Sequence, residues 1–355
     1  MKISIGTKIK DGPWGGGNLF AINLGNYLTR KGNEVIYNLD DDDIDVILLT
    51  EPRKTSESSA FTHIDILKYQ HFVNNEVVVL HRINECDERK NTNYVNSYLI
   101  EANEVADATI FVSTWLRDLF IKQKIKNKNL NVILSGANSE IFNSKDQSIF
   151  KQNEKIKLVT HHWGANWNKG FDIYEQLDNL LNEKSFADKF SFTYIGNLPN
   201  KFKFKNSRVI EPLSGKDLAE EIKKNHIYIT GSLNEPSGNH HIEAAQCGLP
   251  ILYINSGGIP EYCKGFGLDF DHSNFRSQLL SIVDNYESIQ KNMANYPYNA
   301  EIMSGEYETL MLNTYNQRKK ISQNKSNVNL INFIEKYIYI ISRHVKKKLK
   351  NHRLL

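Results

Sequence analysis

The sequence predicts an α/β protein built from two doubly wound, Rossmann-like domains. In both halves of the chain, short apolar runs that suit buried strands alternate with amphipathic helical stripes, a pattern typical of parallel sheets. With 355 residues, the chain is long enough for two domains that each have a core. We expect the first domain at 1–148, the second at 149–318 and a C-terminal tail at 319–355.

The first half opens with a strand, a glycine-rich loop and a helix. Residues 2–7 alternate as a strand does, and a helical stripe follows at 18–31. Gly15, Gly16 and Gly17 therefore precede a helix, where the backbone can approach a phosphate closely. Three consecutive glycines are also typical of a flexible turn, and their position alone favours that interpretation.

Two further features of the first half are candidates for chemistry. The run EVVVLHRINE predicts a buried strand that ends in His81 and Arg82. A histidine at the carboxyl end of a parallel strand can hydrogen-bond a substrate, although many such residues are structural. The run LDDDDIDVILL is acidic, but no ligands at coordinating spacing follow it, so we interpret its acids as solvating the start of a strand and predict no metal site.

The most informative stretch of the second half is a predicted βαβ unit. Its first strand leads into a polar loop with Glu235, Ser237 and Gly238, and a short helix carries Glu243. The start of that helix favours a phosphate, and the two glutamates can accept hydrogen bonds from hydroxyls. A sugar–diphosphate–nucleoside has this order of groups. Upstream, Lys169 stands at a loop–helix junction and is well placed for a diphosphate. Solvated glutamates and a solvated lysine would explain these positions equally well.

Composition excludes several classes of protein. No apolar run reaches the roughly 18–20 residues of a membrane span, and the first residues resemble a strand rather than a signal peptide, so we expect a cytoplasmic protein. Three cysteines without paired spacing support neither a disulfide framework nor a zinc site. The net charge of +3 reflects six Lys and Arg side chains from position 343 onward, where no acid occurs, which argues against a nucleic-acid-binding body.

Glu235 and Glu243, followed by AAQCGLPIL and GGIPE, resemble the E-x7-E region of the retaining glycosyltransferases of family 4, which have the two-domain GT-B fold with a cleft between the domains. The segments GGGNLFAINLGNYLTRKGNEV, VSTWLRDL and VILSGANSEIF are also similar to that family. The resemblance implies that Glu235 contacts the donor sugar and Glu243 the ribose. It also implies that Gly257, Gly258 and the first glycine loop lie near the donor, and that His81 lies near the reacting sugar carbon.

One departure from the family concerns charge. Family members have a Gly-Arg pair before Lys-Gly, whereas His161, His162 and Trp163 stand here, so the phosphate contact of that arginine is missing or supplied otherwise. A protonated histidine would replace it only in part.

The resemblance implies a metal-independent, hexosyltransferase-type enzyme without a cofactor. It would transfer a sugar from a nucleotide-diphosphate donor to a glycan or lipid-linked acceptor, in the synthesis of cell-envelope or capsule polysaccharide or of glycolipid. A nucleotide-sugar 2-epimerase and a non-catalytic partner subunit that binds sugar nucleotides are the alternatives.

The tail predicts a basic amphipathic helix. Apolar residues recur from Leu330 to Leu349 at three- and four-residue steps, and Lys and Arg cluster at the far end. Such a helix can lie on an anionic membrane, which would make the protein peripheral on the inner face. A last helix packed on the protein, with solvated basic residues, is an equally good interpretation.

Overall fold

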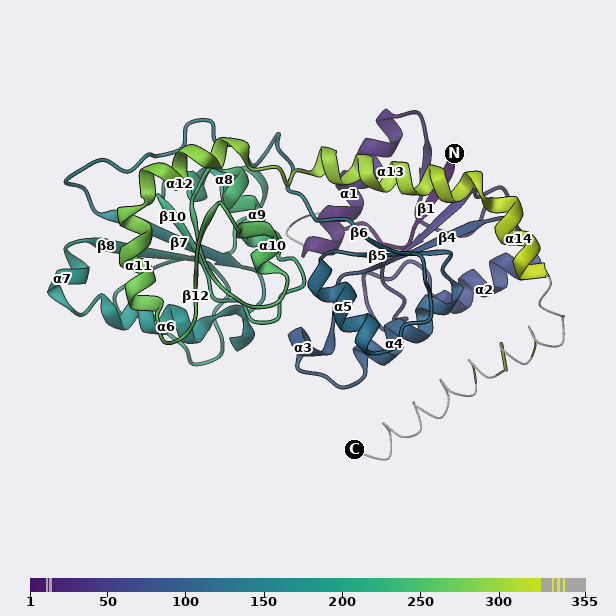
Figure 1. Ribbon diagram of the computed structural model, residues 1–355, viewed down its shortest axis with the longest axis horizontal. Helices are drawn as coiled ribbons and strands as arrows, with labels where there is room; N and C mark the ends of the chain where they lie inside the picture. Colours follow the sequence, from purple (N-terminus) through teal and green to yellow (C-terminus); the bar gives the residue numbers. More distant parts are fainter. Residues whose placement is uncertain (11, 13–14, 327–333, 335–336, 339–340, 342–355) are drawn as a thin grey trace.

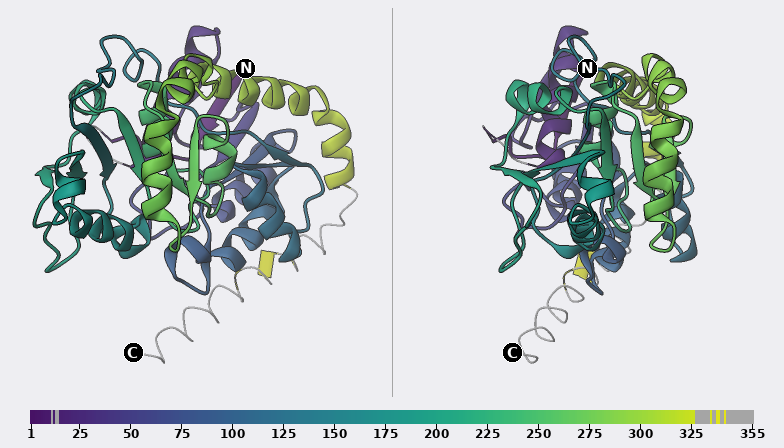
Figure 2. Two further views of the ribbon diagram at one scale, coloured as in Figure 1. Left: turned by 60° about the vertical axis from the view of Figure 1, so that its left-hand side comes forward. Right: turned by 90° about the vertical axis from the view of Figure 1, so that its left-hand side faces the viewer.

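The computed structural model describes the chain except residues 11, 13–14, 327–333, 335–336, 339–340 and 342–355, and it contains two six-stranded sheets with helices on both faces of each (Figure 1). Every strand pair in both sheets is parallel. The predicted fold of two doubly wound domains is therefore confirmed. Figure 2 shows the same two bodies from two other directions.

The first sheet is formed by residues 2–132. Its strands are, in spatial order, β2 (Glu34–Ile36), β1 (Lys2–Ile5), β3 (Val46–Leu49), β4 (Val78–Ile83), β5 (Ala108–Phe111) and β6 (Leu130–Val132). Its helices are α1 (Gly16–Arg30), α2 (His63–Phe72), α3 (Asp87–Lys90), α4 (Val95–Ala102), α5 (Thr114–Lys122) and the 3-10 turn η1 (Asn103–Val105). All four residues of β3 are buried, because helices cover both faces of the sheet.

The second sheet is formed by residues 156–270. Its strands are, in spatial order, β12 (Gly267–Phe270), β11 (Ile251–Ile254), β10 (Ile227–Thr230), β7 (Ile156–His162), β8 (Phe190–Gly196) and β9 (Arg208–Ile210). Its helices are α6 (Phe171–Leu180), α7 (Lys184–Ala187), α8 (Gly215–Lys223), α9 (Asn239–Gln246), α10 (Ile259–Cys263), α11 (Phe275–Asp284), α12 (Tyr286–Asn292) and the 3-10 turns η2 (Trp167–Lys169) and η3 (Met293–Asn295). One large apolar cluster fills its core.

The chain then returns to the first domain through α13 (Ala300–Asn316), which is followed by α14 (Arg318–Ser326) (Figure 1). Met303, Tyr307 and Met311, spaced four residues apart, are buried in one cluster with Phe20 and Leu24 of α1. The predicted second domain, 149–318, takes in α13, whereas the apolar stripe of this helix covers the first sheet. Helical periodicity identifies such a stripe but not the surface that it covers.

The two domains touch through α10 and α5. The carboxylate of Glu261 in the GGIPE segment accepts hydrogen bonds from the backbone amides of Thr114 and Trp115, both at 2.8 Å. These amides are at the start of α5, where helix geometry leaves them without an internal partner and favours a negative charge. The second domain thus caps a helix of the first, and the carboxyl ends of the two sets of strands meet.

The tail helix predicted between Leu330 and Leu349 lies largely outside the described residues, so its membrane role stays a prediction. Within the described part of the chain, no helix combines the length and apolarity that a membrane crossing requires.

Candidate functional site

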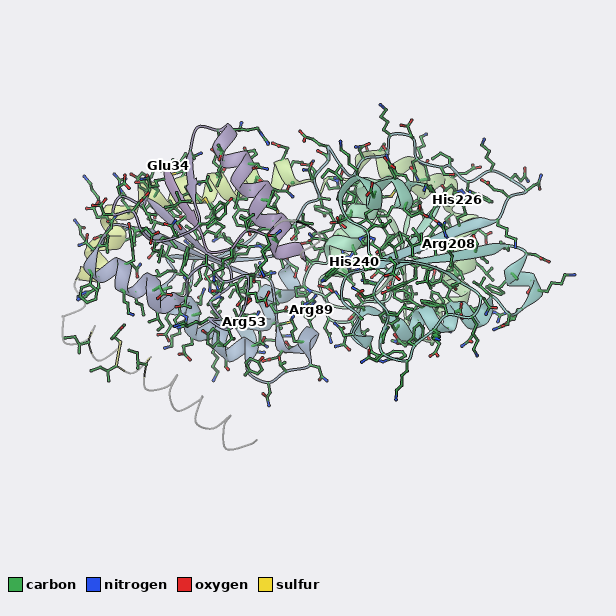
Figure 3. All side chains as sticks on the ribbon, turned by 180° about the vertical axis from the view of Figure 1, so that it is seen from behind. Glu34, Arg53, Arg89, Arg208, His226 and His240 are labelled. Atoms are coloured by element: carbon green, nitrogen blue, oxygen red, sulfur yellow. The ribbon has the colours of Figure 1, made fainter. Side chains whose placement is uncertain are left out.

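Glu235 lies at the junction of the domains, in the loop between β10 and α9, and is only 5% exposed. Its Oε1 lies 2.8 Å from Nε of Arg89, and its Oε2 lies 2.6 Å from Nζ of Lys169. Arg89 belongs to α3 of the first domain and Lys169 to η2 of the second. One buried carboxylate therefore holds a cation from each domain. Figure 3 shows Arg89 where the two domains meet.

The neighbouring charges shift the pKa values of the Glu235 carboxyl and the Lys169 ammonium group. Burial disfavours the charged form of Glu235, but Arg89 and Lys169 outweigh burial, so the pKa of this carboxyl lies well below its usual range. Burial lowers the pKa of Lys169, and the contact with Glu235 opposes that effect. At neutral pH Glu235 is thus ionised, and its carboxylate is paired with Arg89 and Lys169.

Lys169 is held in place by the glycine that follows it. Gly170 has a φ of +93°, and a Cβ there would lie 2.5 Å from the backbone of Gly231. Only glycine adopts this conformation and this approach without strain, so the η2 turn packs directly against the end of β10. The predicted loop–helix junction at Lys169 is present, and its ammonium group points to Glu235.

Arg89 was missed by the sequence analysis. Its guanidinium group also pairs with Glu85 at 2.9 Å, and its backbone carbonyl accepts a hydrogen bond from Asn168 Nδ2 at 3.1 Å. Asn234 Nδ2 likewise donates to the carbonyl of Glu88 at 3.4 Å. The signal in the sequence is the charged run ECDERK directly after β4, because a loop at the carboxyl end of a strand faces the cleft.

Glu243 lies one turn into α9 and is buried beside a histidine. Its Oε2 is 2.9 Å from Nε2 of His161, which is near the end of β7. The hydroxyl of Tyr228 lies 3.2 Å from Nδ1 of the same ring. The second glutamate of the E-x7-E pair is therefore oriented by His161, a contact that the sequence analysis did not predict, and it does not touch Glu235.

Three further histidines crowd this edge of the second sheet. His162 of β7 and His240 of α9 have ring centroids 4.6 Å apart, and His241 follows in the chain. Burial lowers the pKa of His241 to about 3, although the charge of Glu235 opposes it, and burial holds the pKa values of His162 and His240 well below the usual value, with Lys169 and the other histidines acting in the same direction. These imidazoles are neutral at pH 7, so His162 does not replace the missing arginine.

The glycine loop of the first domain meets α9 of the second. A Cβ added at Gly16 would lie 2.9 Å from Nδ2 of Asn239, the first residue of α9, whereas one added at Gly15 or Gly17 would meet no atom of the described residues within 4 Å, apart from those of its chain neighbours. Ser237 is buried, and Gly238, with a φ of +79°, forms the turn into that helix. These residues surround the start of α9, where a phosphate was predicted.

Gly257 and Gly258 pack against the backbone of the Glu235 loop. The amide of Gly258 donates to the carbonyl of Glu235 at 2.8 Å, so it is not free for a donor. A Cβ at Gly257 would lie 2.6 Å from the same carbonyl oxygen. These two glycines therefore hold the Glu235 loop in place.

His81 is not brought to this site. The strand β4 continues to Ile83, so His81 lies inside the sheet and is completely buried. Its Nδ1 is 3.1 Å from Nδ2 of Asn103, and burial together with His63 lowers its pKa to about 3. Its environment is therefore that of a structural histidine, and the strand, predicted to end in His81 and Arg82, continues one residue further to Ile83.

Comparisons with known proteins bear on both sequence and fold. The profile of the family described as "Glycosyl transferases group 1" matches residues 200–303, the part that contains Glu235 and Glu243. None of the curated proteins matches the chain in sequence.

Solved structures are similar over most of the chain. A glycosyltransferase from Rickettsia africae ESF-5 has a TM-score of 0.64 at 15% identity, covering 88% of this chain and 98% of its own. The catalytic domain of starch synthase IV from Arabidopsis thaliana, bound to ADP and acarbose, has a TM-score of 0.64 at 12% identity, covering 89% and 99%. HepE from Anabaena, in complex with UDP and glucose, has a TM-score of 0.57 at 15% identity, covering 92% and 100%. The fold of this chain is GT-B.

Proposed function

We propose that this protein is a glycosyltransferase that transfers a sugar from a nucleotide-diphosphate donor to an acceptor hydroxyl, with retention of configuration and without a metal ion. The GT-B fold and the profile match over residues 200–303 support the coarser part of this proposal, a nucleotide-sugar glycosyltransferase. The observation that carries it is the pairing of Glu235 with a cation from each domain.

The chemistry follows from that cluster. Cleavage of the bond between sugar and diphosphate leaves negative charge on the leaving phosphate. Lys169 and Arg89 are already fixed in a largely buried site, so they can stabilise this charge without reorganising. Arg89 takes the place of the arginine that the resemblance leads one to expect before Lys169. Glu235 would accept hydrogen bonds from the donor sugar and hold it in reacting geometry.

The nucleoside would lie along α9. Among the described residues, Glu243 is bound only through its Oε2, by His161, and Oε1 can accept a ribose hydroxyl. The diphosphate would lie between Lys169 and the start of α9, where Ser237, Gly238 and the loop of Gly16 leave room for the backbone to approach it. His81 has no part in this arrangement.

We further propose a hexosyl donor and a glycan or lipid-linked acceptor, in the synthesis of cell-envelope or capsule polysaccharide or of glycolipid. This rests on the resemblance to family 4. The basic tail supports attachment to the inner face of a membrane, which is where a lipid-linked acceptor would be found.

The decisive experiment is product analysis with radiolabelled sugar nucleotides in the presence of EDTA. Transfer of label to an acceptor or to water supports the proposal, whereas an epimeric sugar nucleotide would identify a 2-epimerase. Binding without any product would identify a non-catalytic subunit. Loss of activity in EDTA that magnesium or manganese restores would contradict metal independence.

The nucleotide can be found first by thermal shift, because a ligand that binds only the folded state raises the melting temperature. UDP and ADP are the first candidates, since the similar structures of HepE and starch synthase IV were solved with them.

A further inference from the structure

A crevice of about 250 Å³ lies between the two domains, directly against Glu235. One wall comes from α3 of the first domain and the other from η2 of the second. Its lining consists of Arg89, Lys90, Asn91, Asn166, Trp167, Asn168, Lys169 and Glu235. Glu243 and the residues at the start of α9 are not part of this lining, so the crevice is separate from the site proposed for the ribose, and it borders the site proposed for the diphosphate at Lys169 and Arg89.

The crevice combines an aromatic face with free amides. Trp167 is 51% exposed, and its ring is held by edge contacts with Phe171 and Phe202, at centroid distances of 6.1 and 5.7 Å. Within the described part of the chain, the side chains of Asn91 and Asn166 make no hydrogen bond. A fixed aromatic surface beside amide donors and acceptors suits a sugar ring, which has an apolar C–H face and a rim of hydroxyls.

The charge of the crevice is positive. Three cations line it against the single carboxylate of Glu235. Lys90 is the most exposed of the three, and its Nζ lies 3.1 Å from Glu85, which does not line the crevice. The carboxylates of Asp87 and Glu88 on the same helix accept hydrogen bonds from Thr92 and Asn96 and do not line it either. The lining itself therefore carries more positive than negative charge, and Lys90 is its most solvent-accessible cation.

We propose that this crevice binds the acceptor, and that the acceptor sugar carries an anionic group, either a carboxylate or a phosphate. The sugar would stack on Trp167, donate and accept hydrogen bonds at Asn91 and Asn166, and direct its anionic group to Lys90. Because Glu235 and Lys169 form the inner end of the crevice, a hydroxyl of the bound sugar lies next to the proposed reacting centre. This inference rests on the proposed glycosyltransferase function.

A second hollow, of about 410 Å³, suits this ligand poorly. It lies between α5, α10 and α13, and its lining contains two carboxylates, Glu261 and Glu306, and no cation. It also shares no lining residue with the crevice at Glu235.

The experiment measures sugar binding to the full chain, saturated with UDP or ADP, by saturation-transfer NMR. The probes are methyl glucuronide, glucose 6-phosphate and methyl glucoside. The first two separate a carboxylate from a phosphate, and the third has neither. We expect one of the charged sugars to bind at least fivefold more tightly than methyl glucoside.

Two pairs of variants test the site. Trp163 is 52% exposed on the same loop but does not line the crevice, so Trp163→Ala is the matched control for Trp167→Ala. We expect Trp167→Ala to weaken binding of every probe at least tenfold and Trp163→Ala to change it less than twofold. Lys90→Gln should remove the preference for the charged sugar, whereas Lys126→Gln, which also loses a lysine paired with a glutamate, should not.

The outcomes are distinguishable. Equal effects of the two tryptophan variants, or no binding of any probe by a chain that does bind a nucleoside diphosphate, would overturn the acceptor crevice and leave the proposed function intact. Binding of methyl glucoside as tight as that of both charged sugars would overturn the anionic acceptor. A chain that shows no thermal shift with any nucleotide would contradict the proposed function itself.

Discussion

Replacing Glu235 by glutamine tests whether its charge holds the two cations. The Glu235→Gln side chain keeps the shape and one oxygen acceptor but loses the negative charge between Arg89 and Lys169. Removing one partner of a buried ion pair destabilises a protein by about 3–5 kcal/mol. Because the amide oxygen still accepts a hydrogen bond from one cation, we expect a loss of about 3 kcal/mol of unfolding free energy.

The same substitution should have opposite effects on binding and on turnover. Lys169 and Arg89 would be released to bind a diphosphate, so the affinity for UDP or ADP should increase about tenfold, roughly the value of one charged hydrogen bond at about 1.4 kcal/mol. Turnover should fall more than tenfold, since the donor sugar loses the carboxylate that orients it.

The assays are calorimetric titration with the nucleoside diphosphate, labelled-sugar transfer and urea unfolding. Glu221→Gln is the matched control, because Glu221 is a buried glutamate paired with Arg208 and Lys224, at 3.0 and 2.6 Å, on α8 away from the cleft. Weaker binding of the diphosphate by Glu235→Gln, or turnover equal to that of Glu221→Gln, would refute the argument.

Four more predictions follow from the same contacts. Lys169→Ala should lower the affinity for a nucleoside diphosphate at least tenfold while leaving that for the nucleoside unchanged, as measured by calorimetry; equal losses for both ligands would place the phosphate contact elsewhere. Glu243→Ala should weaken the binding of nucleoside and nucleoside diphosphate alike, and an effect on the diphosphate alone would argue against a ribose contact. Burial keeps the pKa of His226 at about 4 and that of His241 at about 3, so between pH 6.5 and 4 the unfolded chain binds more protons than the folded one. The unfolding free energy should therefore decrease as the pH falls, by about 1.4 kcal/mol per pH unit for each histidine. A urea midpoint that stays constant from pH 7 to 5 would contradict this prediction. A chain truncated after Lys320 should lose salt-sensitive co-sedimentation with anionic vesicles, and equal sedimentation of both chains would exclude the basic tail as an anchor.

The sequence sufficed for the fold and for part of the site. The strand–helix alternation and the resemblance to family 4 predicted the two doubly wound domains. Lys169 and Glu235 were each selected from a local motif, and the structure brings them into contact.

Long-range packing explains why the sequence alone does not predict the role of Arg89, the burial of His81 or the surface that α13 covers. Arg89 reaches Glu235 from the other domain, and no local pattern shows which charged residue of a loop crosses a cleft. The run EVVVLHRINE predicts a strand that ends in His81 and Arg82, but β4 continues to Ile83, and all of its residues are buried. In the same way, the helical stripe of α13 does not indicate which domain it covers.

The return of α13 to the first sheet has a consequence for how the protein is made. A ribosome delivers the first 132 residues, with all six strands of the first sheet, long before Met303, Tyr307 and Met311 emerge. Until then, the surface of α1 that these side chains cover stays in water. The first domain to be synthesised is thus the last to be completed, and ribosome-bound chains ending before Ala300 should be more sensitive to protease in residues 1–132 than the finished protein.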